Sequence, residues 1–411
     1  MNATTILSII LGIIVLSQLF DWTLSWLNLR AHGKNVPPEL EGQIDADKYA
    51  RSYDYHHVNF RFGMLQSLLS FVVMLPLLAF GWLGWLDELL RNVTEQPVLL
   101  ALMFFGVLFV VSDLTSLPFS WYHTFVIEEK FGFNKTTPKI FWLDKLKGYL
   151  LTIVVGGGVL SFLLWLVITL GPSFWWWFWL FIGGFILLVN LFYTSWILPL
   201  FNKLTPLEDG HLRSAIEDYA KGVDFPLTNI MVLDGSKRSA KANAFFSGIG
   251  KQKKVVLYDT LIEQQSEQEL VAVLAHEVGH YKKKHILQGL ILSLIQTGLM
   301  LFILSRLLFS PALSEALGAE LSSIHLNLLA FGLLYSPIST VLGILMNIVS
   351  RKNEFEADRY AADTYASSPL QTALLQLHTE NLSNATPHPL YVFVNYSHPP
   401  LVQRLRALQK R

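Results

Sequence analysis

The residues best suited to chemistry are His276, Glu277 and His280, which form the pattern His-Glu-x-x-His within VAVLAHEVGHYKKKH. Residues four positions apart lie on one face of a helix, so the two imidazoles can bind one zinc ion. Glu277 lies beside them, where its carboxylate can accept a proton from a water bound to that ion. A helix with two surface histidines is the alternative interpretation of so short a pattern. The spacing therefore predicts a hydrolytic zinc site that needs a further ligand.

A catalytic zinc ion usually has three protein ligands and an open fourth position. The chain contains no cysteine, so the third ligand must be His, Asp or Glu. Glu354 and Asp358 lie four residues apart on one face of a predicted helix, whereas Glu356 points about 200° away from Glu354. We expect Glu354 to be the ligand and Asp358 to hydrogen-bond the far nitrogen of a ligand histidine. The alternative is an exposed, charged helix with internal ion pairs.

The composition indicates a membrane protein. Hydrophobic residues make up 52% of the 411 positions and charged residues only 15%, compared with roughly 25% charged residues in an average soluble domain. The net charge is zero, which argues against nucleic acid as a partner, because a phosphate backbone requires a basic excess. The absence of cysteine excludes disulfides, thiolate zinc ligands and a cysteine nucleophile.

Seven stretches are long and apolar enough to be transmembrane helices, which need about 20 residues each. The N-terminal stretch has no positively charged segment before it and no small-residue cleavage site, so we interpret it as a permanent span. The stretches lie at roughly 5–28, 63–86, 97–118, 148–171, 174–200, 286–309 and 326–350.

Lysine and arginine are abundant in alternate loops, which predicts the orientation, because short cytoplasmic loops are enriched in these residues. The alternation places the N-terminus outside and the active site on the cytoplasmic side. The predicted organisation has four parts. Residues 1–200 contain five transmembrane helices, and residues 201–285 contain His-Glu-x-x-His. Residues 286–350 contain helices six and seven, and residues 351–411 contain the third zinc ligand.

The predicted topology brings the three ligands together. Two successive spans are antiparallel, so the start of the sixth and the end of the seventh lie on the same membrane face. At 1.5 Å per residue, His280 lies roughly 8 Å before the apolar run begins. Glu354 lies about as far beyond the end of the seventh span. The charge pattern is independent of the motif. It therefore predicts that all three ligands lie at one depth on one side of the membrane.

The segment 201–285 has the composition of a small α/β unit. Helical spacing is present at 212–223 and 267–284, and β-rich runs occur at 229–235 and 253–259. Between these runs, NAFFSGIGKQ (243–252) has the pattern of a strand that continues into a glycine turn. The segment is too short for a large core of its own, so we expect it to pack on the C-terminal region or the membrane helices.

Several separated stretches resemble the type I CAAX prenyl endopeptidases, which are intramembrane zinc metalloproteases. Their order along the chain makes this resemblance far more specific than His-Glu-x-x-His alone. The stretches are FVIEEKFGFNKTTPKIFWLDKLKG (125–148), ANAFFSGIGKQKKVVLYDTLI (242–262), LAHEVGHYKKKH (274–285), RKNEFEADRYA (351–361) and NYSHPPLVQRLRAL (395–408).

The resemblance implies a mainly α-helical membrane protein in which seven transmembrane helices form a barrel around an internal chamber. It also implies a small cytoplasmic α/β metalloprotease domain and one Zn²⁺ per chain. Glu277 would be the general base, and Glu354 would complete the zinc ligands. His398 would stabilise the oxyanion, and Arg404 would bind the substrate or support that histidine. The resemblance further implies an edge strand that pairs with an extended substrate, formed by Asn243, Ala244 and Phe245.

The leading hypothesis is a zinc metalloendopeptidase that hydrolyses peptide bonds near the C-terminus of prenylated (CAAX-type) or other membrane-associated substrates. The alternative is a membrane-protein quality-control protease with the same chemistry and no prenyl requirement. A seven-helix transporter or receptor with a structural metal would leave Glu277 without a role. The expected partners are a peptide or lipidated protein and the lipid bilayer, in a bacterial inner membrane or the endoplasmic reticulum. The acidic pair Glu128-Glu129 either binds its loop to the soluble segment or is simply solvated.

Overall fold

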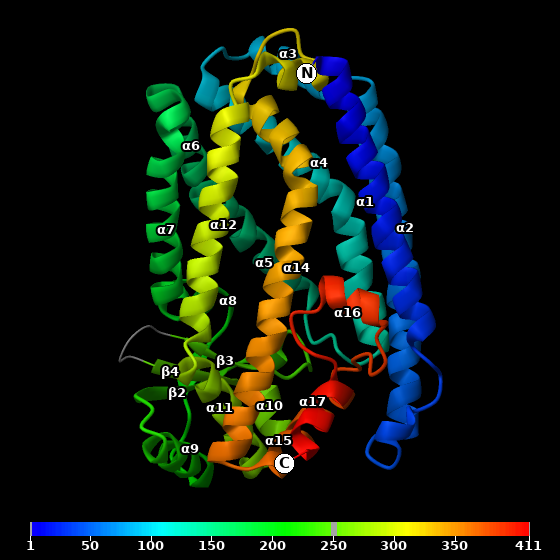
Figure 1. Cartoon of the computed structure of the whole chain (residues 1–411), viewed down its shortest axis with the longest axis vertical. Helices are drawn as coiled ribbons and strands as arrows, with labels where there is room; N and C mark the ends of the chain where they lie inside the picture. Colours follow the sequence, from blue (N-terminus) through cyan, green and yellow to red (C-terminus); the bar gives the residue numbers. More distant parts are fainter. Residues whose placement is uncertain (1, 248–252, 411) are drawn as a thin grey trace.

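Long helices form one end of the molecule and a small α/β unit forms the other (Figure 1). The computed structural model describes residues 2–247 and 253–410. The N-terminus lies at the end occupied only by helices, and the C-terminus lies at the end that holds the sheet (Figure 1).

The helices of the first half are α1 (Ala3–Ala31), α2 (Ala46–Ala79), α3 (Trp82–Arg91), α4 (Pro97–Tyr122), α5 (Pro138–Leu151), α6 (Gly157–Leu170), α7 (Phe174–Phe192) and α8 (Leu198–Phe201). Those of the second half are α9 (His211–Gly222), α10 (Asp259–Gln264), α11 (Glu267–Lys282), α12 (His285–Leu307), α13 (Pro311–Ala316), α14 (Ile324–Thr364), α15 (Ser367–Glu380), α16 (Pro389–Asn395) and α17 (Leu401–Gln409).

Six helical segments of the described chain are long and apolar enough to cross a membrane. They are Ala3–Ala31, Ala46–Ala79, Pro97–Glu128, Pro138–Phe201, His285–Leu307 and Ile324–Thr364. The fourth segment changes direction at a short 3₁₀ turn, Gly171–Ser173, and α6 and α7 on either side of this turn pack against each other (Figure 1). Gly171 has a φ of 53°, a conformation that glycine adopts without the steric cost of a side chain. The two stretches predicted at 148–171 and 174–200 therefore belong to one helical segment that contains a turn.

The small unit contains a four-stranded mixed sheet in the order β1-β2-β4-β3. β2 and β4 run parallel, while β1 and β3 are antiparallel to their neighbours. β3 therefore lies at one edge of the sheet, with Ala244 opposite Leu257 on β4. The glycine turn predicted after β3 falls on residues 248–252, which lie outside the described part. The strands are β1 (Leu204–Pro206), β2 (Leu227–Leu233), β3 (Ala244–Ser247) and β4 (Lys253–Tyr258).

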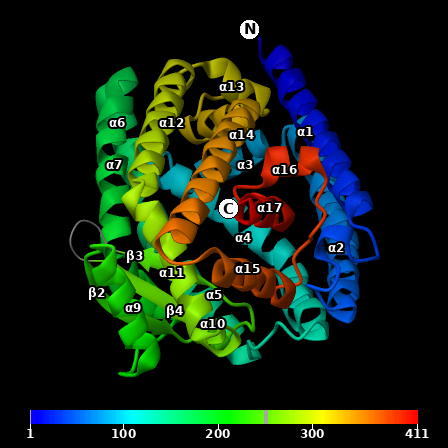
Figure 2. The same cartoon turned by 60° about the horizontal axis from the view of Figure 1, so that its bottom comes forward.

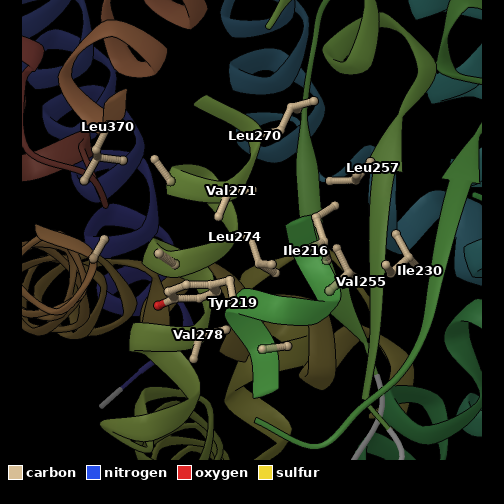
Figure 3. Packing of buried hydrophobic residues seen from close by; sticks show 14 of the residues in the cluster. Ile216, Tyr219, Ile230, Val255, Leu257, Leu270, Val271, Leu274, Val278 and Leu370 are labelled. Carbon is tan, nitrogen blue, oxygen red and sulfur yellow. The ribbon is translucent and has the colours of Figure 1, made fainter. Parts of the chain in front are cut away.

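A hydrophobic core joins the sheet to the helix that carries the His-Glu-x-x-His pattern. Side chains from α9, β2, β4 and α11 meet in this core (Figure 3). Ala361 of α14, Leu370 of α15 and Leu408 of α17 complete the same cluster. As expected, the small unit is not independent, because part of its core comes from the C-terminal helices.

The contact between α11 and α14 is unusually close. A Cβ atom added at Gly279 would lie 3.0 Å from the Cα atom of Ala357 and 3.1 Å from the Cβ atom of Tyr360. The absence of a side chain at Gly279 lets the two backbones approach, and Figure 2 shows α11 beside the lower end of α14. The N-terminus of α11 is held by a capping box, in which Ser266 and Glu269 bond each other's backbone amides. The sequence therefore fixes both the start of α11 and its distance from α14.

We predict that Gly279→Ala lowers the free energy of unfolding by about 1–3 kcal/mol, because the added methyl group overpacks the α11–α14 contact. Gly343→Ala is the matched control, since a Cβ atom there has no neighbour within 4 Å. The control should be neutral or stabilising, because alanine favours a helix by about 1 kcal/mol over glycine. Thermal unfolding of the purified variants measures both effects. An equal change in the two variants would contradict the packing argument.

Candidate metal centre

Three side chains that suit a metal ion meet where α11 contacts α14. One donor atom from each of His276, His280 and Glu354 lies within 4.8 Å of the other two. The Nε2 atoms of the histidines are 3.2 Å apart, and Glu354 Oε1 is 3.2 Å from His280 Nε2. The sequence predicted these three residues as the zinc ligands, and the fold brings them together.

The donor set fits zinc. Two imidazole nitrogens and one carboxylate are a common set at catalytic zinc sites, with a fourth position left for water or substrate. Glu354 is only 4% exposed, and its buried Oε2 atom has no hydrogen-bond partner among the described residues. The Arg404 guanidinium is nearby, but its Nη1 atom is 3.5 Å from Oε2. A buried carboxylate oxygen without a hydrogen bond is costly, and a bound cation would remove this cost.

Asp358 orients the first histidine. Its Oδ1 atom is 2.9 Å from Nδ1 of His276, so the carboxylate accepts the Nδ1 proton and leaves the Nε2 lone pair facing the metal position. Burial lowers the pKa of His276, but the carboxylates of Asp358 and Glu354 outweigh this effect and raise the pKa to about 9. The predicted role of Asp358 therefore agrees with its position, and metal binding has to displace a proton from His276.

Arg404 forms a bidentate ion pair with Asp358 and shares the Oδ1 atom with His276. Its Nε and Nη2 atoms donate to the two carboxylate oxygens at 2.8 and 2.6 Å, and the side chain is almost fully buried. A bidentate pair of this kind fixes the carboxylate as well as neutralising it. Arg404 thus lies against the acidic residues of the site, one side chain away from the metal position.

Glu277 lines the same cavity as the three donor residues. This cavity has a volume of about 340 Å³ and is also lined by Asn243, Ala244 and His398. Burial raises the pKa of Glu277, and the negative charge of Glu354 raises it further. A carboxyl group whose pKa is shifted toward neutrality is suited to accepting and returning a proton.

His398 and the predicted substrate strand meet at this cavity. The Nε2 atom of His398 is 3.3 Å from Glu354 Oε1, and its side chain is 64% exposed. Asn243 and Ala244 line the cavity, whereas the Phe245 side chain packs near Tyr258. Ala244 and Phe245 differ in this way because successive side chains of a strand point to opposite faces. The backbone of β3 is therefore what the edge can offer to a substrate.

His285 is a site residue that the sequence analysis missed. Its Nδ1 atom is 3.1 Å from Nδ1 of His280, and its Nε2 atom is 3.3 Å from Glu356 Oε2. The Glu356 carboxylate can only accept, so His285 Nε2 carries a proton and Nδ1 accepts from His280. This leaves the Nε2 lone pair of His280 facing the metal position. Lys284, with a φ of 61°, turns the chain so that His285 folds back toward His280.

Glu356, which was expected to face elsewhere, lies beside His285 and not among the metal donors. Its carboxylate forms the outer end of a chain of contacts through His285 to His280. The signal in the sequence was the histidine at the end of the lysine run, five positions after His280.

Glu128 binds its loop to the small α/β unit, which was one of the two roles left open for the Glu128-Glu129 pair. The Tyr55 hydroxyl donates to Glu128 Oε1 at 2.6 Å, and Lys241 Nζ lies 3.0 Å from Oε2. Lys241 is two residues before Asn243, so this cluster holds the start of the edge strand. Glu129 is exposed and accepts a hydrogen bond from Asn134 in its own loop.

Comparison with known proteins finds matches across nearly the whole chain. Residues 25–203 match the family described as CAAX prenyl protease N-terminal, five membrane helices, and residues 206–411 match peptidase family M48. A CAAX prenyl protease 1 homolog of Oryza sativa subsp. japonica is 36% identical, with 98% of this chain and 97% of the relative covered. CAAX prenyl protease 1 of Saccharomyces cerevisiae is 33% identical, with 93% and 91% covered.

The fold is also similar to a solved structure. The crystal structure of S. mikatae Ste24p matches with a TM-score of 0.93 and 32% sequence identity. The match covers 98% of this chain and 99% of that chain. The similarity therefore includes both the membrane helices and the unit that holds the candidate metal centre.

We predict that Glu354→Ala lowers zinc affinity by more than the roughly 10–100-fold typical of residues that only support a ligand. Glu356→Ala should keep one zinc per chain at saturating zinc, because its carboxylate contacts His285 and none of the donors. Metal analysis of the purified variants after dialysis against a series of zinc concentrations measures both the affinity and the zinc bound at saturation. Equal loss of bound zinc at saturation would contradict the assignment of Glu354 as the ligand.

A separate prediction concerns His285, which holds Nδ1 of His280. His285→Ala should weaken zinc binding by roughly 10–100-fold while leaving one site per chain, because the ligand imidazole loses its orienting partner. Competition with a chromophoric chelator measures the affinity. His211→Ala is the control, since His211 is exposed at the start of α9. An unchanged affinity in the His285 variant would show that the contact does not orient the ligand.

Proposed function

Since this chain belongs to peptidase family M48 and carries the N-terminal membrane region of the CAAX prenyl proteases, we propose that it cleaves prenylated (CAAX-type) or other membrane-associated substrates near their C-termini. Family membership makes it a membrane metallopeptidase. The observation that carries the proposal is the convergence of the His276, His280 and Glu354 donors with Glu277 in one cavity.

One Zn²⁺ per chain would be held by His276, His280 and Glu354, and when bound it supplies a Lewis acid that activates water and polarises the scissile carbonyl. Glu277 accepts a proton from the attacking water and returns it to the leaving nitrogen. His398 donates a hydrogen bond to the oxyanion that develops on the carbonyl, and loss of one such donor typically slows the reaction by about 10²–10³-fold.

The substrate would bind as an extended strand along the free edge of β3. Among the described residues β3 pairs with β4 alone, and Asn243 and Ala244 at its start line the catalytic cavity. Backbone hydrogen bonds along such an edge hold a peptide irrespective of its side chains. The cluster of Glu128, Tyr55 and Lys241 would keep the start of this edge in place.

We also propose that the chain crosses the membrane seven times, with the N-terminus outside and the metal centre on the cytoplasmic side. The turn at Gly171 supports this number, since it divides one long helical segment into two. The two termini lie at opposite ends of the molecule, as an odd number of spans requires (Figure 1). The alternating lysine and arginine content of the loops supports the orientation.

A polar cavity between α1 and α2 supports the proposal of a barrel with an internal chamber. It has a volume of about 440 Å³, and most of the amides and hydroxyls that line it lie on helices that are apolar enough to span a membrane. Polar groups in such helices usually face water or the interior of the bundle. Its lining includes Gln18, Ser25, Asn28, Asn59 and Asn384. The membrane would be the endoplasmic reticulum or a bacterial inner membrane.

We predict that Glu277→Gln binds zinc as the parent protein does but loses cleavage by about 10²–10⁴-fold, because the amide cannot accept the proton. Cleavage of a fluorogenic prenylated peptide by purified protein measures the rate. The control is Glu267→Gln, at an exposed position in the first turn of the same helix. Equal rates for the Glu277 variant and its parent would remove the proposed mechanism.

The same assay separates the proposed function from its alternative, a quality-control protease with no prenyl requirement. Binding through a strand edge does not by itself select a prenylated substrate. A lower KM for the prenylated peptide than for its unprenylated counterpart would support the CAAX role. Equal kcat/KM for the two peptides would favour the alternative.

A further inference from the structure

A hollow on the outside of the helix pair α12–α14 is separate from the catalytic cavity. It has a volume of about 460 Å³ and combines lysine side chains at one end with apolar side chains of α12 at the other. None of its lining residues is shared with the cavity that contains Glu277. We call it the lysine hollow. Its lining is formed by Lys283, Lys284, His285, Leu287, Gln288, Ile291, Leu292, Lys352, Asn353 and Glu356.

The charge of the lysine hollow is positive. Lys283, Lys284 and Lys352 are exposed, and neither Lys283 nor Lys284 forms an ion pair with any described residue. Lys352 Nζ is 3.8 Å from Glu356 Oε1, so one carboxylate opposes three ammonium groups. The left-handed conformation of Lys284 is uncommon for a residue with a side chain, and it places two lysines at the junction of α11 and α12.

The apolar part of the lysine hollow continues onto a surface suited to acyl chains. Leu287 is 51% exposed and Ile291 is 48% exposed, on a helix that is apolar enough to span a membrane. Leu287 and Ile291 are four residues apart and therefore lie on one face of α12. Cationic groups thus lie directly beside an exposed apolar stripe.

The base of the lysine hollow is held together by polar contacts between the two helices. Asn353 donates a hydrogen bond to Gln288 at 2.9 Å, which links α14 to α12. His285 and Glu356 contact each other across the same interface. The alternative is that these lysines only extend from the helix ends toward water. Such lysines would not need a pocket between two helices.

We propose that the lysine hollow binds an anionic phospholipid, with its phosphate on Lys283, Lys284 and Lys352 and its acyl chains along Leu287 and Ile291. Basic pockets between transmembrane helices are suited to anionic headgroups. The headgroup lies against His285, whose other face contacts the ligand histidine His280. The lipid therefore braces the junction that orients a metal ligand. This binding does not depend on the proposed substrate.

The experiment compares the full-length protein in nanodiscs of phosphatidylcholine alone and of phosphatidylcholine with phosphatidylserine. After extraction, native mass spectrometry counts the lipids that remain bound. Parent protein should retain phosphatidylserine in preference to phosphatidylcholine. Lys283→Gln/Lys352→Gln should weaken that retention by about fivefold for each lysine removed, or roughly 25-fold for the pair. Lys284 is left unchanged because of its backbone conformation.

The matched control is Lys135→Gln/Lys139→Gln, which removes two exposed lysines, one from the segment before α5 and one from the first turn of α5. This variant should retain phosphatidylserine as the parent does. Equal losses in the two double variants would show only general attraction to a charged surface and would overturn the proposal. Displacement of the lipid by millimolar inorganic phosphate would also overturn it, because the site would then bind a soluble anion. The proposal would also be overturned if the parent protein retained phosphatidylserine and phosphatidylcholine equally.

Discussion

The rest of the site depends on the close approach of α11 to α14. Gly279 lies directly before His280 in the sequence and packs against Ala357. Ala357 is three residues after Glu354 in α14. A larger residue at this contact would separate the two imidazoles from the carboxylate of Glu354. Local helix geometry therefore brings two of the proposed ligands together, and one interhelical contact adds the third.

This arrangement has an energetic cost, because several charged groups are buried together. Glu354, Asp358 and Arg404 are all nearly inaccessible to solvent. The Arg404–Asp358 pair compensates its own charges by two short hydrogen bonds, whereas Glu354 keeps one oxygen without a hydrogen bond among the described residues. This difference separates the structural part of the cluster from the part that is available to a cation.

Residues whose roles follow from helical spacing could be predicted from the sequence. His276, His280, Glu354 and Asp358 lie on helix faces that the pattern defines. Their location on one side of the membrane, which the charge alternation predicts, stays a prediction. His285 could not be predicted in this way, because its position depends on the left-handed turn at Lys284. Contacts between distant segments were equally hidden. The link from Glu128 to Lys241 and the bond from Arg404 to Asp358 exist only after the chain has folded.

The membrane part shows a related limit. Apolar stretches identified where the chain is hydrophobic, but hydrophobicity alone does not mark where a helix ends. The stretch predicted at 326–350 belongs to α14, which continues to Thr364 without interruption and carries Glu354 and Asp358. The turn at Gly171–Ser173 falls between the two stretches predicted at 148–171 and 174–200, although both belong to one helical segment of the structure.

The length of α14 has a mechanical consequence. At 1.5 Å per residue its 41 residues extend about 60 Å, so one rod runs from the far end of the helical part to the acidic ligand. A change in the tilt of this rod, such as bilayer thickness imposes on spanning helices, displaces the carboxylate relative to the two imidazoles on α11. The thickness of the surrounding lipid would thereby act on the spacing of the three donor groups, through the part of the rod that crosses the membrane.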